Sequence, residues 1–305
     1  MHSLAELAFL KTIELGSIRA ASRALGQDPS GISRRITQLE QRLGTKLVDR
    51  TGKATTPTAK GQVYFERLSR LVDQLHALEA EVSGDDLEPD GLLRVTAAID
   101  FGQEFLTDWL LEFRTLYPRV EFELTLAGGF IDLVETGVDV AIRVGHLPDS
   151  SLIAKKLAEV PRVLVASNGY LERAGVPETP EDLANHDFVL FSAQNRTQPL
   201  VLHDAAGRQY RINRSGGVTV NAVRSAVKAV LADQGIHSGP HWAFAHQIAT
   251  AEVAVILPDF TQGSFPLYAV RQPSTVVPAR ISRFIEFIGQ KVRTIDGLSF
   301  WAAGP

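Results

Sequence analysis

The chain has 305 residues, of which 45% are hydrophobic and 22% charged, a composition typical of a globular protein with two or three domains. It has no cysteine, which excludes disulfides, thiolate metal sites and cysteine nucleophiles. No apolar run approaches the roughly 18–20 residues that span a bilayer, and the chain does not begin like a signal peptide, so we expect a cytoplasmic protein without membrane contact. The net charge is −4, but residues 1–60 hold ten Lys and Arg against five Asp and Glu. Only this segment is basic enough to attract phosphates.

The basic segment is predicted to be helical. We expect a first helix over residues 4–15, followed by two short helices with a tight break between them. Ser17 can cap the first of this pair, while Asp28 is a good N-cap and Pro29 a good first residue for the second, which Gly44 ends. Apolar residues recur every three or four positions and form the predicted buried faces of the pair: Ile18, Ala21, Leu25, Ile32, Ile36, Leu39 and Leu43.

The outward side of the last helix carries small and polar side chains, namely Ser30, Gly31, Ser33, Arg34, Arg35 and Thr37. Small residues near its N-terminus allow close approach to a major groove. Ser and Thr can reach phosphates or base edges, and Arg can pair with guanine through two hydrogen bonds. The alternative is an exposed amphipathic hairpin of the kind found on any soluble protein.

A small β-hairpin is expected next. Residues 46–48 and 54–56 are predicted as two short strands around a basic turn, which together make a wing. Arg50, Thr51 and Lys53 are placed to contact backbone phosphates, since most protein–DNA hydrogen bonds go to the backbone. The alternative is a solvated basic turn.

The segment AASRALGQDPSGISRRITQLEQRLGTKLVDRT resembles the N-terminal winged helix-turn-helix of the LysR-type transcriptional regulators, and the rest of the chain follows the layout of that family. The family usually has Ser-Gln where this chain has Asp28-Pro29. The resemblance implies binding to double-stranded promoter or operator DNA and dimerisation through a linker helix. It also implies a two-lobed effector-binding domain like the periplasmic solute-binding proteins.

A long helix is predicted after the wing, capped by Thr58 and ending near residue 83. Its apolar residues are spaced alternately four and three apart, a heptad seam suited to one partner helix: Tyr64, Leu68, Leu71, Leu75, Leu78 and Val82. We therefore expect a homodimer or homotetramer, the alternative being that the seam packs against the chain's own C-terminal domain. The acidic segment at 84–91 is the predicted hinge.

We thus expect three parts: a winged helix-turn-helix domain at 1–60, a dimerisation helix and hinge at 61–90, and an α/β effector-binding domain at 91–305. Within the last part we place lobe I at about 91–162 and 266–305 and lobe II at about 163–265. The predicted strands are 92–97, 121–127, 139–144, 163–166, 188–191, 200–203, 210–212, 218–220 and 267–271, and the predicted helices are 104–116, 131–135, 221–232 and 279–292.

Open α/β sheets bind ligands beyond the carboxyl ends of their strands. Three segments fit that position and give the candidate effector-binding residues: Ala98, Ile99, Asp100 and Phe101, then Arg143 and Gly145, then Ser192, Thr219, Asn221, His237 and Ser238. Free helix N-termini and Arg143 favour a small carboxylate. Two alternatives stay open: Arg143 pairs with Asp139 or Asp149, and Asp100 would oppose an anion, which leaves room for a neutral or amine-bearing effector.

No catalytic motif is evident. His237, His241 and His246 lack a zinc-site pattern, and Asp233 with His237 and Ser238 offers only the residue types of a triad. We expect no metal, no cofactor and no enzymatic activity. The leading hypothesis is a LysR-type regulator that senses a small molecule. The alternatives are a small-molecule-processing enzyme with an accessory DNA-binding module, and an architectural DNA protein whose cleft is vestigial.

Overall fold

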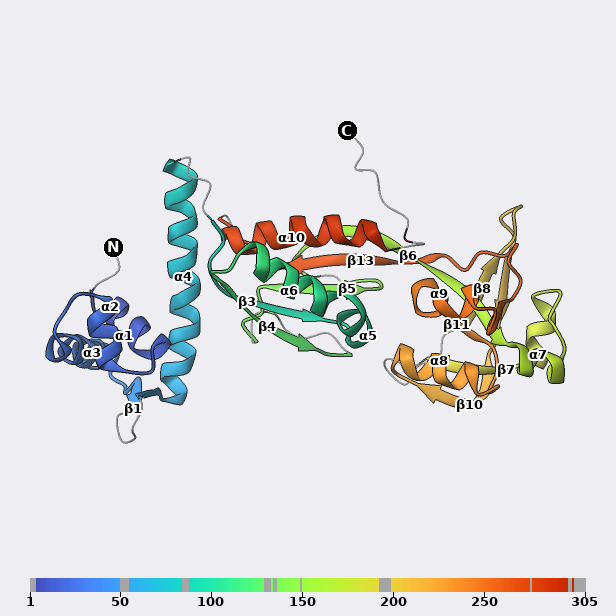
Figure 1. The fold of residues 1–305 in the computed structure, drawn as a ribbon, viewed down its shortest axis with the longest axis horizontal. Helices are drawn as coiled ribbons and strands as arrows, with labels where there is room; N and C mark the ends of the chain where they lie inside the picture. The colour runs from blue at the N-terminus through green and yellow to red at the C-terminus, as the bar shows by residue number, and fades with distance from the viewer. Residues whose placement is uncertain are drawn as a thin grey trace. The chain divides into compact units, whose positions relative to one another are not determined.

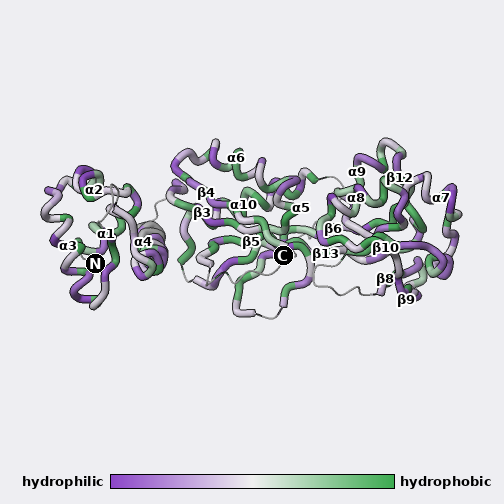
Figure 2. The backbone as a smooth tube through the Cα atoms, turned by 90° about the horizontal axis from the view of Figure 1, so that it is seen from below, coloured by the Kyte–Doolittle hydropathy of each residue, from purple (hydrophilic) through white to green (hydrophobic). Residues whose placement is uncertain are grey.

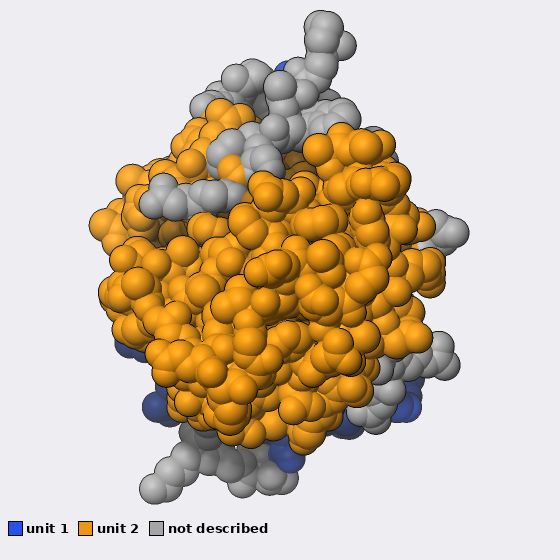
Figure 3. All heavy atoms as spheres, turned by 90° about the vertical axis from the view of Figure 1, so that its right-hand side faces the viewer, with its two compact units in different colours: residues 1–87, 275–278 blue, residues 88–274, 279–305 orange. Residues whose placement is uncertain are grey.

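The computed structural model describes residues 4–49, 55–83, 88–128, 133, 136–148, 150–191, 199–274, 276–295 and 298. The chain forms two compact units (Figure 3): unit 1 comprises residues 1–87 and 275–278, and unit 2 comprises residues 88–274 and 279–305. Among the predicted site residues, Arg50, Thr51, Lys53 and Ser192 lie outside the described residues, as does nearly all of the helix predicted at 131–135. No described helix is both long and apolar enough to cross a membrane.

Unit 1 is a helical domain with a two-stranded wing (Figure 1). Its elements are α1 (Leu4–Glu14), α2 (Ile18–Ala24), α3 (Pro29–Leu43), β1 (Val48–Asp49), β2 (Thr56–Pro57) and α4 (Ala59–Ser83). The predicted helix ends are confirmed. The Ser17 hydroxyl accepts the N–H of Ala20, the Asp28 carboxylate accepts that of Gly31, and Gly44 ends α3 with a φ of 65°.

The wing strands lie about two residues further along the chain than predicted. The backbone of Leu47 is not part of the ladder, because its N–H donates to the Glu40 carboxylate at 2.8 Å and its carbonyl accepts the N–H of Thr58 at 3.0 Å. The antiparallel pairing therefore starts at Val48, which lies opposite Pro57.

The core of unit 1 is formed by α1, α2, α3 and the first turns of α4. Its buried members are Ala8, Phe9, Leu10, Ala21, Ile32, Ile36, Leu39, Leu47, Val48 and Leu68. Leu43, predicted to be buried, is 40% exposed, since the chain turns at Gly44 and Leu47 supplies the next core side chain.

The predicted cap of α4 is confirmed, because the Thr58 hydroxyl accepts the N–H of Gly61 at 3.0 Å. The heptad seam is divided between two environments. Leu68 is buried in the core of unit 1, whereas Leu71, Leu78 and Val82 are 59%, 43% and 81% exposed.

Unit 2 contains two α/β lobes joined by two long antiparallel strands, which Figures 1 and 2 show side by side. These are β6 (Ile153–Ser167) and β13 (Ser264–Arg271). Residues 153–161 of β6 pair with β13 in lobe I, and residues 162–167 pair with β11 (His237–Pro240) and β12 (Val253–Val255) in lobe II. The sequence predicted only the last part of β6, since Lys155, Lys156 and Glu159 interrupt its apolar pattern.

Lobe I surrounds the sheet β6-β13-β5-β3-β4, in which β3 is parallel to both β4 and β5. Its remaining elements are β3 (Gly91–Ala97), α5 (Ile99–Phe101), a π-helical turn (Gly102–Leu106), α6 (Thr107–Leu116), β4 (Val120–Leu126), β5 (Val140–Val144), α10 (Ala279–Lys291) and a 3₁₀ turn (Val292–Thr294). The helix expected at 104–116 thus begins five residues earlier. Gly102 allows this helical segment to lie close to Leu126 at the end of β4, because a Cβ at position 102 would lie 2.2 Å from the Leu126 side chain.

Lobe II contains more helices than predicted. Its elements besides the ends of β6 and β13 are α7 (Asn168–Ala174), a 3₁₀ turn (Glu181–Asn185), β7 (Asp187–Phe191), β8 (Leu200–His203), β9 (Gln209–Ile212), β10 (Ser215–Val220), α8 (Val223–Leu231), β11, α9 (His241–Ala249) and β12. The helices α7 and α9 and the strands β11 and β12 were not predicted. They are between three and nine residues long, too short to show a periodic pattern.

Candidate nucleic-acid interface and interlobe site

The N-terminus of α3 is closed by its own cap. Asp28 Oδ1 accepts the Ser30 hydroxyl at 2.6 Å and the Gly31 N–H at 2.8 Å, and these two bonds lower the pKa of Asp28. A Cβ at Gly31 would lie 2.8 Å from the same carboxylate. The predicted contact residues Ser30 and Gly31 therefore also shape the cap.

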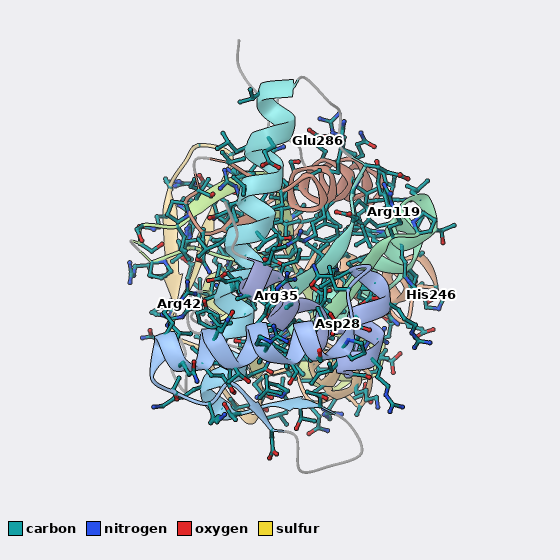
Figure 4. All side chains as sticks on the ribbon, turned by 90° about the vertical axis from the view of Figure 1, so that its left-hand side faces the viewer. Asp28, Arg35, Arg42, Arg119, His246 and Glu286 are labelled. Atoms are coloured by element: carbon teal, nitrogen blue, oxygen red, sulfur yellow. The ribbon has the colours of Figure 1, made fainter. Side chains whose placement is uncertain are left out.

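The arginines of α3 differ in their partners. Arg35 donates to the side-chain oxygen of Gln27, and Arg42 donates to Glu6. Figure 4 shows Asp28, Arg35 and Arg42 in this order along the helix. Arg34 is exposed and makes no hydrogen bond or ion pair within the described residues. Its guanidinium is thus the one on this face that is available to a ligand.

Thr37 and Ser33 complete the predicted face. The Thr37 hydroxyl donates to the Ser33 carbonyl at 3.0 Å, one turn back along α3, and both residues are half-buried.

A residue that the sequence analysis missed, Glu40, fixes the wing to α3. Its side chain is 3% exposed, and its carboxylate accepts the N–H groups of Leu47 at 2.8 Å and Val48 at 3.1 Å. Burial by itself raises the pKa of Glu40, but the Lys46 ammonium at 3.0 Å and the two N–H groups outweigh burial and lower it. A single Glu inside an amphipathic helix gives no sequence signal for this role.

In unit 2 the structure brings α5 of lobe I against the N-terminus of α8 in lobe II (Figure 1). The Asp100 carboxylate accepts the backbone N–H of Val223 at 2.8 Å and that of Arg224 at 3.2 Å. The Arg224 guanidinium also forms an ion pair with Glu104.

Aromatic rings extend this contact. The ring of Phe105 lies edge-on to that of Trp242, with centroids 5.3 Å apart. Phe101, predicted to face the effector, is 2% exposed and packs against Phe105 and Trp109. Ala98 and Ile99 precede these residues at the carboxyl end of β3.

Arg143 is a buried cation in lobe I. It is 8% exposed, and its Nη2 atom has no hydrogen-bond partner within the described chain. Burial lowers its pKa. The alternative pairing with Asp139 is not supported, since burial alone accounts for the shifted pKa of Arg143. Asp139 accepts the N–H of Arg94 at 2.9 Å, and Asp149 lies outside the described residues.

Gly145 lies two residues further along, just beyond β5. Its φ of 106° favours glycine, and its N–H donates to Pro266 at 2.8 Å. Because β3 and β5 are parallel neighbours, Gly145 and Ala98 share one edge of the sheet.

The candidates in lobe II occupy different environments. Thr219 and Asn221 are exposed on the approach to α8. His237 is 1% exposed, its Nδ1 lies 2.8 Å from the Val189 carbonyl, and burial lowers its pKa to about 4. The Ser238 hydroxyl accepts from Arg162 at 2.6 Å and donates to Gln262 at 2.5 Å.

The possible triad is not assembled. Asp233 accepts the hydroxyl of Ser167 at 2.6 Å, and no bond joins Asp233, His237 and Ser238 to one another in the described structure. Within the same residues, no three His, Cys, Asp or Glu side chains are grouped to hold a metal ion.

Two family comparisons agree with this arrangement. Residues 7–62 match the bacterial regulatory helix-turn-helix protein, lysR family, and residues 87–293 match the LysR substrate binding domain. The chain belongs to the LysR family of transcriptional regulators. It is therefore a DNA-binding regulator whose C-terminal domain binds a small-molecule effector.

Individual LysR-type relatives cover nearly the whole chain. An HTH-type transcriptional repressor of Pseudomonas aeruginosa is 29% identical over 94% of this chain and 92% of its own. The regulator CrgA of Neisseria meningitidis is 29% identical over 93% of this chain and 95% of its own. A solved structure of CrgA matches with a TM-score of 0.60 at 28% identity, over 96% of this chain and 99% of that one. These relatives are named as regulators, which favours the regulator hypothesis over the enzyme alternative.

Proposed function

We propose that this LysR-type regulator reads its operator with α3, pairs with a second copy through α4, and responds to a small carboxylate that binds between the lobes of unit 2. The proposed boundaries are those of the sequence analysis: 1–60 for DNA binding, 61–90 for pairing and 91–305 for effector binding. The observation that carries the proposal is the exposed, uncommitted guanidinium of Arg34 in the middle of an otherwise capped and packed helix.

The DNA contacts divide into two kinds. Arg34 is proposed to read a base edge, because an Arg with no partner among the described residues can donate two hydrogen bonds to guanine. Arg35 is held by Gln27 and is better placed to orient the helix against a phosphate. The other proposed contacts are Ser30, Gly31, Ser33 and Thr37 on α3, and Arg50, Thr51 and Lys53 in the wing.

The effector proposal rests on Arg143. Among the described residues its guanidinium has no counter-charge; burying an unpaired charge is costly, and an anionic ligand would relieve that cost. The proposed site combines residues at the edge shared by β3 and β5 with residues of lobe II that follow β7, precede α8 or lie in β11: Ala98, Ile99, Asp100, Phe101, Arg143, Gly145, Ser192, Thr219, Asn221, His237 and Ser238. This arrangement favours a carboxylate over an amine as the effector's charged group.

Pairing through α4 is proposed from its exposed apolar residues. Leu71, Leu78 and Val82 are exposed, and Leu78 and Val82 lie beyond Val72, the last residue of α4 that packs against the core of unit 1. Large exposed apolar side chains at heptad spacing are suited to a second copy of the same helix.

The experiment that tests DNA reading compares Arg34→Ala with Arg42→Ala. Both variants remove one positive charge from α3, but Arg42 is paired with Glu6 near the end of the helix. We expect Arg34→Ala to weaken operator binding by about 1–3 kcal/mol and to bring it closer to binding of scrambled DNA, because a base contact is lost. Arg42→Ala should change neither affinity nor preference appreciably. Fluorescence anisotropy on operator and scrambled duplexes at near-physiological salt measures both quantities.

Two other results would contradict the assignment. Equal losses on operator and scrambled DNA for Arg34→Ala would make Arg34 a phosphate contact. A larger loss for Arg42→Ala than for Arg34→Ala would move the interface to the other end of α3.

A further inference from the structure

The N-terminus of α8 has no cap of its own. Its N-cap residue is Ala222, whose side chain cannot accept a hydrogen bond. The first turn of any helix leaves backbone N–H groups unsatisfied unless a side chain, water or ligand accepts them. Here two of these groups, on Val223 and Arg224, donate to one carboxylate, that of Asp100.

Asp100 reaches α8 from the other lobe. It lies in α5, 123 residues before Val223. The chain itself passes from one lobe to the other at β6 and again at β13. A carboxylate at a helix N-terminus also interacts favourably with the helix dipole. The contact therefore joins lobe I to lobe II by a charge-assisted hydrogen-bonded cap.

Two neighbouring contacts also join lobe I to lobe II. Glu104 forms an ion pair with Arg224, and Phe105 packs edge-on against Trp242 of α9. Asp100, Glu104 and Phe105 all lie in the continuous helical segment that includes the π-helical turn at 102–106. A π turn is rare and frequently marks a functional site.

We propose that Asp100 is a positioning residue: its carboxylate caps α8 across the interlobe boundary and holds the two lobes together before any effector binds. A cap supplied within α8 would fix only that helix, whereas a cap supplied by α5 fixes one lobe to the other. Regulation follows from this, because the effector-free protein is then already biased to one lobe arrangement, and any effector acts against that bias. Only this last consequence rests on the interlobe effector site proposed above.

Hydrogen–deuterium exchange on the full-length protein, without DNA or added small molecule, tests the cap. In Asp100→Ala, the Val223 and Arg224 amides should exchange on the order of tenfold faster, since each loses its acceptor. Asp108→Ala is the matched control, because Asp108 is an exposed acid eight residues further along the same helical segment with no bond in the described structure. It should leave the exchange of residues 221–231 unchanged.

A conservative variant separates positioning from a general loss of fold. Asn is also a good N-cap acceptor, so Asp100→Asn should give exchange between those of the wild type and Asp100→Ala. If circular dichroism shows that Asp100→Ala does not fold, the hydrogen exchange of Asp100→Asn still tests the cap. Unchanged exchange of residues 221–231 in a folded Asp100→Ala or Asp100→Asn variant would overturn the proposal.

Operator binding tests the regulatory consequence. Effector-free Asp100→Ala should differ from wild type in operator affinity by about fivefold or more, with Asp108→Ala unchanged. Faster exchange with unaltered operator affinity would refute the link to regulation and leave the cap in place. A wild-type protein that does not prefer its operator would instead refute the proposed DNA reading, and the exchange result would be unaffected.

Discussion

Glu40 in unit 1 and Arg143 in unit 2 both bury a charged group, but they differ in what surrounds it. Glu40 has an ammonium and two backbone N–H groups around its carboxylate. Arg143 has a buried Nη2 atom with no partner among the described residues. A buried charge is tolerated when it is paired and hydrogen-bonded and is costly when it is not.

The comparison separates two uses of buried charge. In unit 1 the charge holds two pieces of the chain together, so that the wing has a fixed place next to the C-terminal end of α3. In unit 2 the Nη2 atom of Arg143 has no hydrogen-bond partner in the described part of the fold, which leaves this atom for a ligand. His237 is a second buried ionisable group of unit 2. Burial and the nearby cations Arg214 and Arg162 lower its pKa, so they favour its neutral form.

The largest predicted effect is the response of unit 2 to acid through His237. Its pKa is about 4 in the folded protein and about 6.5 when unfolded, so between these values the unfolded chain binds the additional proton. The contribution of neutral His237 is complete above pH 6.5 and decreases as the pH falls toward 4. Acidification across this range should lower the free energy of unfolding of unit 2 by about 3 kcal/mol.

Tryptophan fluorescence during urea unfolding measures this effect. All three tryptophans, at positions 109, 242 and 301, belong to unit 2, so their signal does not report on unit 1. His237→Gln keeps an amide donor for the Val189 carbonyl and should flatten the pH dependence. An equally steep dependence in His237→Gln would assign the effect to another group.

Glu40→Ala is predicted to have the next largest effect, and in unit 1. It leaves the buried N–H groups of Leu47 and Val48 without an acceptor, which should destabilise unit 1 by about 1–3 kcal/mol. Because the folded pKa of Glu40 is lowered from 4.5, its contribution is present above pH 4.5 and is lost as the pH falls through the folded value. Unit 1 should thus withstand mild acid better than unit 2.

The check is hydrogen exchange of peptides that cover residues 45–49, compared between wild type, Glu40→Gln and Glu40→Ala. Glu40→Gln keeps an oxygen acceptor but loses the charge opposite Lys46, so its loss should be smaller. Equal exchange in all three proteins would mean that Glu40 does not hold the wing.

The sequence predicted the contacts that are local and missed those that are distant. Asp28 was identified as a cap because it precedes α3 directly and is followed by Pro29. Asp100 is also a cap, but of a helix 123 residues away, and the sequence predicted it as a candidate effector-binding residue that would oppose an anion. No periodicity or spacing connects Asp100 to Val223, since the sheet topology brings them together.

The same reasoning explains the strands and helices. Strand β6 was predicted only over residues 163–166, because the pattern is apolar there and the charged residues of its first half are accommodated by contacts such as the bond of Glu159 with Ser264. The family resemblance predicted the two lobes correctly. The effector residues remain predictions, since they depend on side chains from both lobes.

The smallest predicted change in stability is a gain, from Arg143→Met. Arg143 is a buried cation without a partner in the described structure, so replacing it by an apolar side chain of similar length removes a desolvation cost and should stabilise unit 2 by about 1 kcal/mol or more. We expect benzoate, used as a probe carboxylate, to stabilise the wild type but not Arg143→Met, because the proposed binding depends on the guanidinium. Arg114→Met, at an exposed position of α6, is the control and should keep the carboxylate response. Fluorescence-detected unfolding with and without benzoate measures both quantities.

A loss of stability in Arg143→Met would show that the guanidinium is satisfied within the fold. It would then resemble Glu40, and the difference between the two buried charges would disappear.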